Sequence, residues 1–152
     1  RRREGRRDGH EMVLRKHNEV QCLTNSCITM NNDNESPLDS LSFRFAVAIR
    51  ALCLSKMAHS NGDKNSLIQL YRSGTSVGAN IRESRYAESK KDLLHKLKIA
   101  EKELGECSFW LQVLSCEPRL LNPVDTNEVN ELGRNLKRVL RRAILTLKKQ
   151  NL

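Results

Sequence analysis

Apolar residues recur along residues 89–116 at alternating spacings of four and three, the pattern of a helix that buries one side. This heptad seam predicts that the helix packs lengthwise against another helix. Ser89 and Asp92 form a capping signature at its start, and Pro118 is expected to end it after about Cys116. The seam consists of Leu93, Leu97, Ala100, Leu104, Cys107, Leu111 and Leu114.

Three further segments show the same helical period. The first begins at Ser36, an N-cap residue followed by proline at the first helical position, and is expected to end near Ala58. The second begins around Asp63 and continues through Gly74 and Gly78. Glycine inside a helix costs roughly 1 kcal/mol relative to alanine, so we expect another helix to pack closely against these two residues.

The last predicted helix carries a buried stripe that ends at Leu147. Asn122 and Pro123 lead into it, and Asp125 with Glu128 is the expected capping pair. Its stripe is formed by Val129, Leu132, Leu136, Val139, Leu140, Ala143 and Leu147. Four such helices with short connections predict an all-α, antiparallel up-down four-helix bundle over residues 36–152.

Residues 1–35 show no sustained periodicity and are expected to form a disordered basic and polar tail. The arginines at its beginning, between Arg1 and Arg7, are interpreted as a solvated tail, with a nucleic-acid arm as the alternative. We expect Met30, just ahead of the folded region, to be the natural start, so that residues 1–29 are upstream sequence.

The charge balance of the 152 residues favours an anionic partner. There are 27 Lys and Arg against 18 Asp and Glu, a formal net charge of +9, which suits RNA, DNA or an acidic protein surface. Aromatic residues make up only 4%, which argues against a sheet that stacks bases on exposed rings. Any nucleic-acid contact is therefore expected to involve mainly phosphates.

The cysteines and the hydropathy pattern bear on the compartment. There are five cysteines, and Cys53 and Cys107 fall on apolar helical positions, as expected of reduced thiols in the cytosol. No apolar run reaches the length of a membrane span or resembles a signal peptide. We expect a cytoplasmic protein that does not contact membranes.

A helical wheel of the last helix places seven cations opposite its apolar stripe. They are Arg134, Lys137, Arg138, Arg141, Arg142, Lys148 and Lys149, and we call them the basic ridge. Residues 132–152 contain no acid, so the ridge is expected to lack internal neutralisation and to attract phosphate. The alternative is an ordinary solvated face. Arg82 and Arg85 of the second helix are candidates to extend the ridge.

The helix over residues 89–116 also carries apolar residues away from its seam. These are Ile99, Phe109, Trp110 and Val113, which we call the apolar strip. Either another helix of the same chain covers the strip, or it forms a contact between subunits. We favour a homo-oligomer, with Trp110 as an anchor of the interface.

The sequence offers little that indicates catalysis. Asp92 and His95 have the spacing of a carboxylate–histidine metal pair, but di-iron bundles need a second such motif and two further glutamates, which the predicted helices lack. Glycine-rich phosphate loops and nucleophile elbows are absent as well. We expect no enzymatic activity, no metal and no cofactor.

One set of residues carries a family resemblance. It comprises Ser76, Val77, Gly78, Ala79, Asn80, Ile81, Arg82, Glu83 and Ser84, then Ser89, Asp92, Leu93, Leu94, Lys96, Leu97, Ile99, Ala100, Lys102, Glu103, Glu106, Phe109, Trp110 and Leu111. Over about residues 40–150 the chain resembles the four-helix-bundle proteins encoded by intervening sequences in bacterial 23S ribosomal RNA genes. Many members have glycine at the position of Ser84, so this chain resembles a variant subgroup.

The resemblance implies more than the fold. It implies an antiparallel four-helix bundle that assembles into a ring-like homopentamer, as in the related accessory proteins of diversity-generating retroelements. Those accessory proteins are basic, bind nucleic acid and engage a reverse transcriptase. Asn80, Ile81 and Glu83 match the signature of the family on the second helix, where the resemblance implies an architectural role.

Two functional hypotheses follow. The first is an oligomeric module that binds RNA or another nucleic acid through the basic ridge, with steep salt dependence. The second is a scaffold that docks another protein, such as a reverse transcriptase, through the ridge or the apolar strip and has no nucleic-acid specificity of its own.

Overall fold

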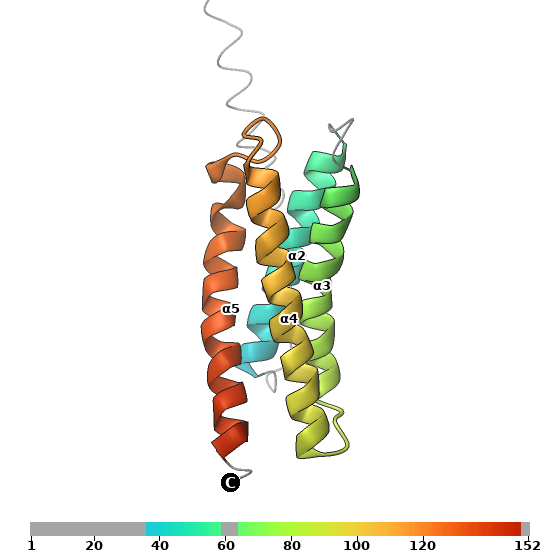
Figure 1. The fold of residues 1–152 in the computed structure, drawn as a ribbon, viewed down its shortest axis with the longest axis vertical. Helices are drawn as coiled ribbons and strands as arrows, with labels where there is room; N and C mark the ends of the chain where they lie inside the picture. The colour runs from blue at the N-terminus through green and yellow to red at the C-terminus, as the bar shows by residue number, and fades with distance from the viewer. Residues whose placement is uncertain (1–35, 59–63, 150–152) are drawn as a thin grey trace, which may run out of the picture. The chain divides into compact units, whose positions relative to one another are not determined.

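The computed structural model describes residues 36–58 and 64–149, and within these ranges the chain forms four α-helices and no strands. The helices are α2 (Pro37–Met57), α3 (Lys64–Ser84), α4 (Lys90–Ser115) and α5 (Pro123–Lys149). They run alternately up and down, each packs against the next, and α5 packs back against α2 (Figure 1). The predicted all-α four-helix fold is confirmed. The expected tail, including Met30 and the arginines at its start, lies outside the described residues.

Two helix starts lie where their caps were predicted. The backbone N–H of Asp39 donates to Ser36 Oγ at 3.2 Å, and α2 begins at Pro37, directly after this serine. The backbone N–H of Asp92 donates to Ser89 Oγ at 3.1 Å at the start of α4. In both helices the serine hydroxyl satisfies a backbone donor that has no partner within the helix.

The predicted cap of α5 was wrong. Asn122, not Asp125, caps the helix, because the N–H of Asp125 donates to Asn122 Oδ1 at 3.0 Å. The carboxylate of Asp125 accepts in return from the N–H of Asn122 at 3.1 Å, so the two residues form a reciprocal capping box. Pro123 then occupies the first helical position, where its missing N–H costs nothing.

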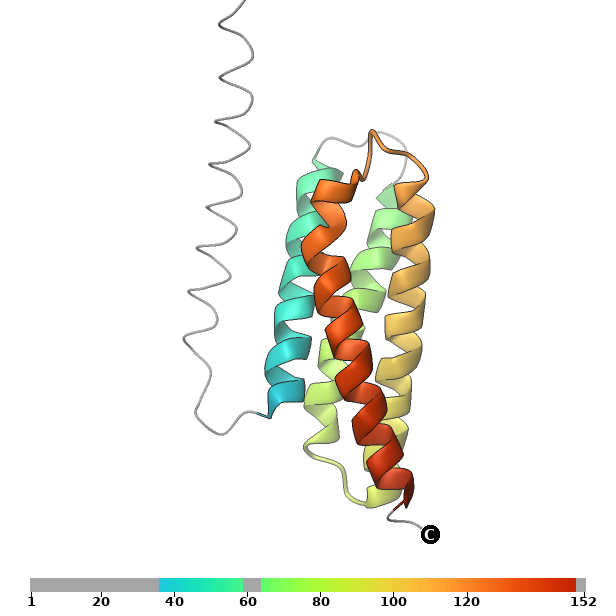
Figure 2. The same ribbon diagram turned by 90° about the vertical axis from the view of Figure 1, so that its left-hand side faces the viewer.

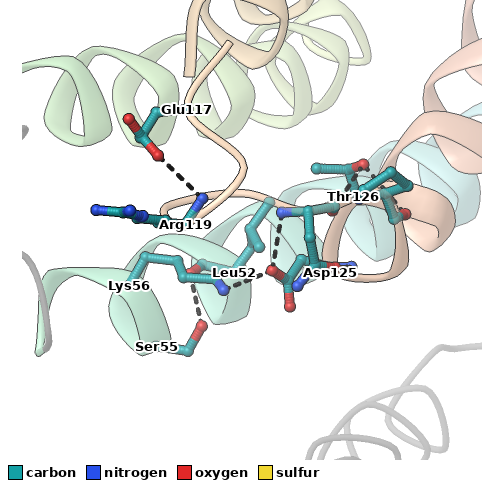
Figure 3. Close-up of polar contacts among 9 residues, drawn as sticks. Leu52, Ser55, Lys56, Glu117, Arg119, Asp125 and Thr126 are labelled. Atoms are coloured by element: carbon teal, nitrogen blue, oxygen red, sulfur yellow. Dashed lines mark hydrogen bonds and ion pairs between the residues drawn. The ribbon is translucent and has the colours of Figure 1, made fainter. Parts of the chain in front are cut away.

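An ion pair joins the ends of α2 and α5. Lys56 Nζ, in the last turn of α2, lies 2.5 Å from Asp125 Oδ2, in the first turn of α5 (Figure 3). In the loop before α5, Glu117 Oε1 accepts from the backbone N–H of Arg119 at 3.2 Å. Asp125 therefore both completes the capping box of its own helix and holds that helix against α2.

The heptad seam of α4 faces the core, as predicted. All of its residues except Leu93, which is partly buried, are buried. The other helices and the connection before α5 contribute the remaining fully buried side chains, the largest of which are Phe45, Ile49, Leu67, Leu70, Ile81, Leu121, Leu136 and Leu140. A single apolar core thus runs along the axis of the four helices.

The two glycines of α3 lie where α2 packs closely against it, as predicted. A Cβ atom on Gly74 would lie 2.6 Å from Cγ2 of Ile49, and one on Gly78 would lie 3.3 Å from the carbonyl oxygen of Ser42. α3 continues through both positions without a break. Their lack of a side chain lets the two backbones come together.

Burial makes two of the three described cysteines unreactive. Removal from water raises the pKa of the Cys53 and Cys107 thiols to about 12, whereas Cys116 is exposed. Because only the thiolate reacts with alkylating agents, iodoacetamide at pH 8 should modify Cys116 in the native protein and leave the buried pair intact until denaturant is added. Peptide mapping by mass spectrometry checks this, and native labelling of Cys53 or Cys107 would show that the core is not packed as described.

Candidate nucleic-acid interface

The basic ridge lies on the outer face of α5. Burial of Leu136, Leu140 and Ile144 in the core turns the opposite side of the helix to solvent, and all seven ridge residues are exposed. Figure 2 shows α5 in front of the bundle, between α2 and α4. One open surface is lined by Arg134, Lys137, Arg138, Arg141, Arg142 and Lys149, together with Leu145 and Thr146.

The ridge lacks an acid of its own, as expected, but a neighbouring helix neutralises one of its cations. Arg141 Nε lies 3.4 Å from Glu101 Oε1, and the same carboxylate accepts from Lys98. The hydrogen bond from Lys98, together with its charge and the contact with Arg141, lowers the pKa of Glu101. The neutralising acid comes from α4, so a search for acids along residues 132–152 could not find it.

The other ridge residues keep their charge available. Arg138 donates to the neutral amide oxygen of Asn135 at 3.2 Å, which leaves its charge unpaired. Arg134, Lys137 and Arg142 form no ion pair with any residue that the structure describes. Unpaired cations on one helix face are what a run of phosphates requires.

Arg82 and Arg85, the two candidate extensions of the ridge, lie in different surroundings. Arg82 Nε is 3.9 Å from Oδ1 of Asp39, a buried carboxylate of α2. Arg85 lines a hollow at the end of the bundle together with the ridge residue Arg142. Arg85 therefore shares a surface with the ridge, whereas Arg82 faces the acid of a neighbouring helix.

Leu145 is a surface feature that sequence reasoning missed. It lies among the ridge cations, and 59% of its surface is exposed. Its position on the wheel, outside the apolar stripe of α5, was the signal available in the sequence. The ridge is thus a cationic surface with one apolar contact point near its centre.

The apolar strip of α4 is only partly covered by the chain itself. Phe109 is 55% exposed and Val113 is 40% exposed, while Ile99 and Trp110 are half-buried. The rings of Phe109 and Trp110 meet edge to face with centroids 5.2 Å apart, and the indole N–H donates to Glu106. Trp110 packs against the core, so the most exposed ring of the strip belongs to Phe109.

The signature residues of α3 make their contacts within the bundle. Ile81 is buried in the core, and Asn80 Nδ2 donates to the carbonyl oxygen of Ser76 at 2.9 Å. Glu83 accepts from Lys96 of α4 at 2.7 Å. Ser84, at the end of α3, is buried and donates to the carbonyl oxygen of Ile81.

Asp92 and His95, the candidate metal pair, are not part of any group of described side chains that could bind a metal ion. His95 is exposed, and Asp92 takes part in the start of α4. Across residues 36–58 and 64–149, no three His, Cys, Asp or Glu side chains are grouped so that they could hold a metal ion. None of the described helices is both long enough and apolar enough to cross a membrane.

Comparisons with known proteins point to one family. Residues 39–142 match the sequence model of the family described as 23S rRNA-intervening sequence protein. The crystal structure of a protein with unknown function from the S23 ribosomal protein family of Bacteroides thetaiotaomicron superimposes with a TM-score of 0.62. The two sequences are 32% identical, and the match covers 70% of this chain and 97% of that one. No curated protein matches the chain.

Proposed function

The chain belongs to the 23S rRNA-intervening sequence protein family, and from this premise we propose that it is a non-enzymatic, oligomeric protein that binds structured RNA through the basic ridge of α5 in the cytoplasm. The observation that carries the proposal is the alignment of seven exposed cations on one helix, of which only Arg141 is paired with an acid within the described residues. Such a face binds phosphates by releasing their counterions.

The proposed RNA ligand is supported by the geometry of the ridge. Its side chains project from one helix whose other side is anchored in the core, so the spacing of their Cα atoms is fixed before RNA binds. A preformed helix reduces the backbone conformational entropy that is lost on binding. The structural relative is described as a member of the S23 ribosomal protein family, which is consistent with an RNA partner.

Cross-linking tests which part of the chain contacts RNA. An RNA hairpin that carries 4-thiouridine in its stem and loop is irradiated with the full-length protein, and cross-linked peptides are identified by mass spectrometry. We expect cross-links within residues 134–149. Cross-links confined to the arginines of residues 1–7 would contradict the proposal and assign RNA binding to the tail.

We further propose that the protein is a homo-oligomer. The expected state is a pentamer, as the family resemblance implies. Phe109 and Val113 expose apolar surface on a helix that already packs against α3 and α5, so this surface is free to meet another subunit. Aromatic anchors of this kind carry much of the binding energy at interfaces.

A charge placed on the apolar strip should disrupt the oligomer. Phe109→Lys introduces a charge that the interface would have to bury, and we expect it to convert the assembly into monomers in sedimentation velocity. Val124→Lys is the matched control, because Val124 is 81% exposed and lies at the start of α5, outside the strip. A wild-type protein that sediments as a monomer, or an assembly indifferent to Phe109→Lys, would contradict the proposed interface.

A second candidate function is that of a protein scaffold, for example for a reverse transcriptase. The observation that favours it is Leu145, an exposed apolar side chain among the ridge cations, which suits a protein surface of mixed acidic and apolar character. The scaffold predicts weak affinity for RNA that does not depend on the ridge arginines. The cross-linking experiment separates the two functions.

A further inference from the structure

A cleft of about 510 Å³ lies between α4 and α5, beside the basic ridge. Its volume falls within the range of small-molecule sites, about 300–1,000 Å³. Its floor and walls are formed by Phe45, Leu104, Leu111, Val129 and Leu140, and its rim includes Lys98, Glu101, Ser108, Asn130, Arg134, Lys137 and Arg141. Three of the ridge cations thus border both the open face of α5 and this cleft.

Two glycines form the sides of the cleft. Gly105 of α4 has no atom within 4 Å of the position that a Cβ would occupy, so the space beside it is open. Gly133 of α5 has Phe45 Cε2 3.3 Å from the corresponding position, so the ring of Phe45 closes the cleft from below. The absence of side chains at these two positions keeps the space between the helices unfilled.

We infer that this cleft receives an unpaired nucleobase of a bound RNA while Arg134 and Lys137 hold the adjoining phosphates. The inference rests on the proposed RNA binding and specifies its ligand. Apolar side chains suit the faces of a base, and Arg134 and Lys137 are exposed cations that can reach the adjoining phosphates. The carboxylate of Glu101 also lines the cleft, but it is paired with Lys98 and Arg141. The side-chain amide of Asn130 makes no hydrogen bond with described residues, so it can bond the polar edge of the base. The hydroxyl of Ser108 accepts from the side chain of Gln112 at 3.4 Å and can still donate to the base.

The inference predicts a preference for RNA with unpaired nucleotides. A base within a duplex is stacked and paired and cannot enter a cleft between two helices, whereas a bulged base can leave the helix at little cost. A stem with a single bulged nucleotide should therefore bind about tenfold more tightly than the same stem without the bulge. The bulged RNA carries only one phosphate more than the paired stem, so most of the tenfold ratio is expected to come from the base, and a variant with a filled cleft separates the two contributions.

Gly105→Leu tests the cleft without altering the ridge. The new side chain extends into open space, fills the cleft and leaves every cation in place. We expect the affinity of this variant for the bulged stem to fall about tenfold, so that it binds the bulged stem no more tightly than the paired stem. Its affinity for the paired stem should equal that of the wild type. Gly105→Ala is the matched control, because a methyl group leaves most of the cleft empty and should preserve the preference. Thermal unfolding verifies that both variants are folded.

A second readout follows the base itself. With 2-aminopurine as the bulged nucleotide, the wild-type protein should shield its fluorescence from acrylamide quenching, and Gly105→Leu should abolish the shielding. Equal affinity of the wild-type protein for the two stems would contradict the binding of a base in the cleft, and so would a preference for the bulged stem that survives in Gly105→Leu. Either result would leave the proposal of RNA binding by the ridge intact. If neither stem bound the wild-type protein, both the proposed RNA binding by the ridge and the proposed base binding in the cleft would be contradicted.

Discussion

Replacement of Arg138, Arg141 and Arg142 together by alanine should weaken the binding of structured RNA by roughly 100-fold at moderate salt. Each residue is exposed on the basic ridge, and loss of a charged phosphate contact costs about 1 kcal/mol, so three losses add to about two orders of magnitude. The midpoint of unfolding should change little, because all three side chains lie off the buried stripe. The ion pair lost at Arg141 is at the surface and contributes at most about 1 kcal/mol.

A matched variant separates the ridge from net charge. Replacement of Arg44, Arg50 and Arg72 by alanine removes the same charge from exposed positions on α2 and α3. We expect this variant to retain most of the RNA affinity in fluorescence anisotropy. If the two triple variants lost the same RNA affinity, the affinity would depend only on the net charge of the protein and not on the ridge. A loss of helicity in the α5 variant, seen by circular dichroism, would show that α5 is oriented incorrectly.

Gly74→Ala should destabilise the bundle by about 1–3 kcal/mol, although alanine is the better helix former by about 1 kcal/mol. The added Cβ would lie 2.6 Å from Cγ2 and 2.8 Å from Cγ1 of Ile49. Ile49 is fully buried and β-branched, so it cannot rotate away without a clash elsewhere. Denaturant unfolding followed by circular dichroism at one fixed protein concentration measures the change in free energy.

Two further variants sharpen this test. Gly105→Ala places a methyl group in open space and should stabilise the protein by roughly 0.5–1 kcal/mol through helix propensity alone. In the double variant with Ile49→Ala the two closest contacts disappear, so Gly74→Ala should cost less than in the wild type. If Gly74→Ala stabilised the protein as much as Gly105→Ala does, the close approach of α2 and α3 would be refuted.

The helices could be predicted because their signals are local. Ser36 and Ser89 each precede an apolar period and satisfy a backbone donor three residues on, which needs no knowledge of tertiary structure. The start of α5 was misplaced because Asn122, Asp125 and Glu128 offer two overlapping capping patterns. Pro123 decides between them, since proline is favoured at the first helical position and Asn122 is then the cap.

The candidate site could be predicted only as far as it lies on one helix. The exposure of the ridge follows from the period of α5 alone. The contact of Glu101 with Arg141 joins residues forty positions apart on different helices, and the cleft depends on how α4 and α5 pack around Phe45 of α2. No local pattern encodes those distances, so neither feature could be inferred before the helices were placed.

The most direct test of RNA binding by the ridge is the affinity of the full-length protein for a structured RNA hairpin measured across a series of salt concentrations. We predict tight binding whose logarithm falls steeply with the logarithm of salt, and a slope that is shallower by about 2–3 in the variant lacking Arg138, Arg141 and Arg142. The basic tail is present in both proteins, so its contribution cancels in the difference between the slopes. Negligible binding at moderate salt, or identical slopes for the two proteins, would contradict the account and favour the protein scaffold.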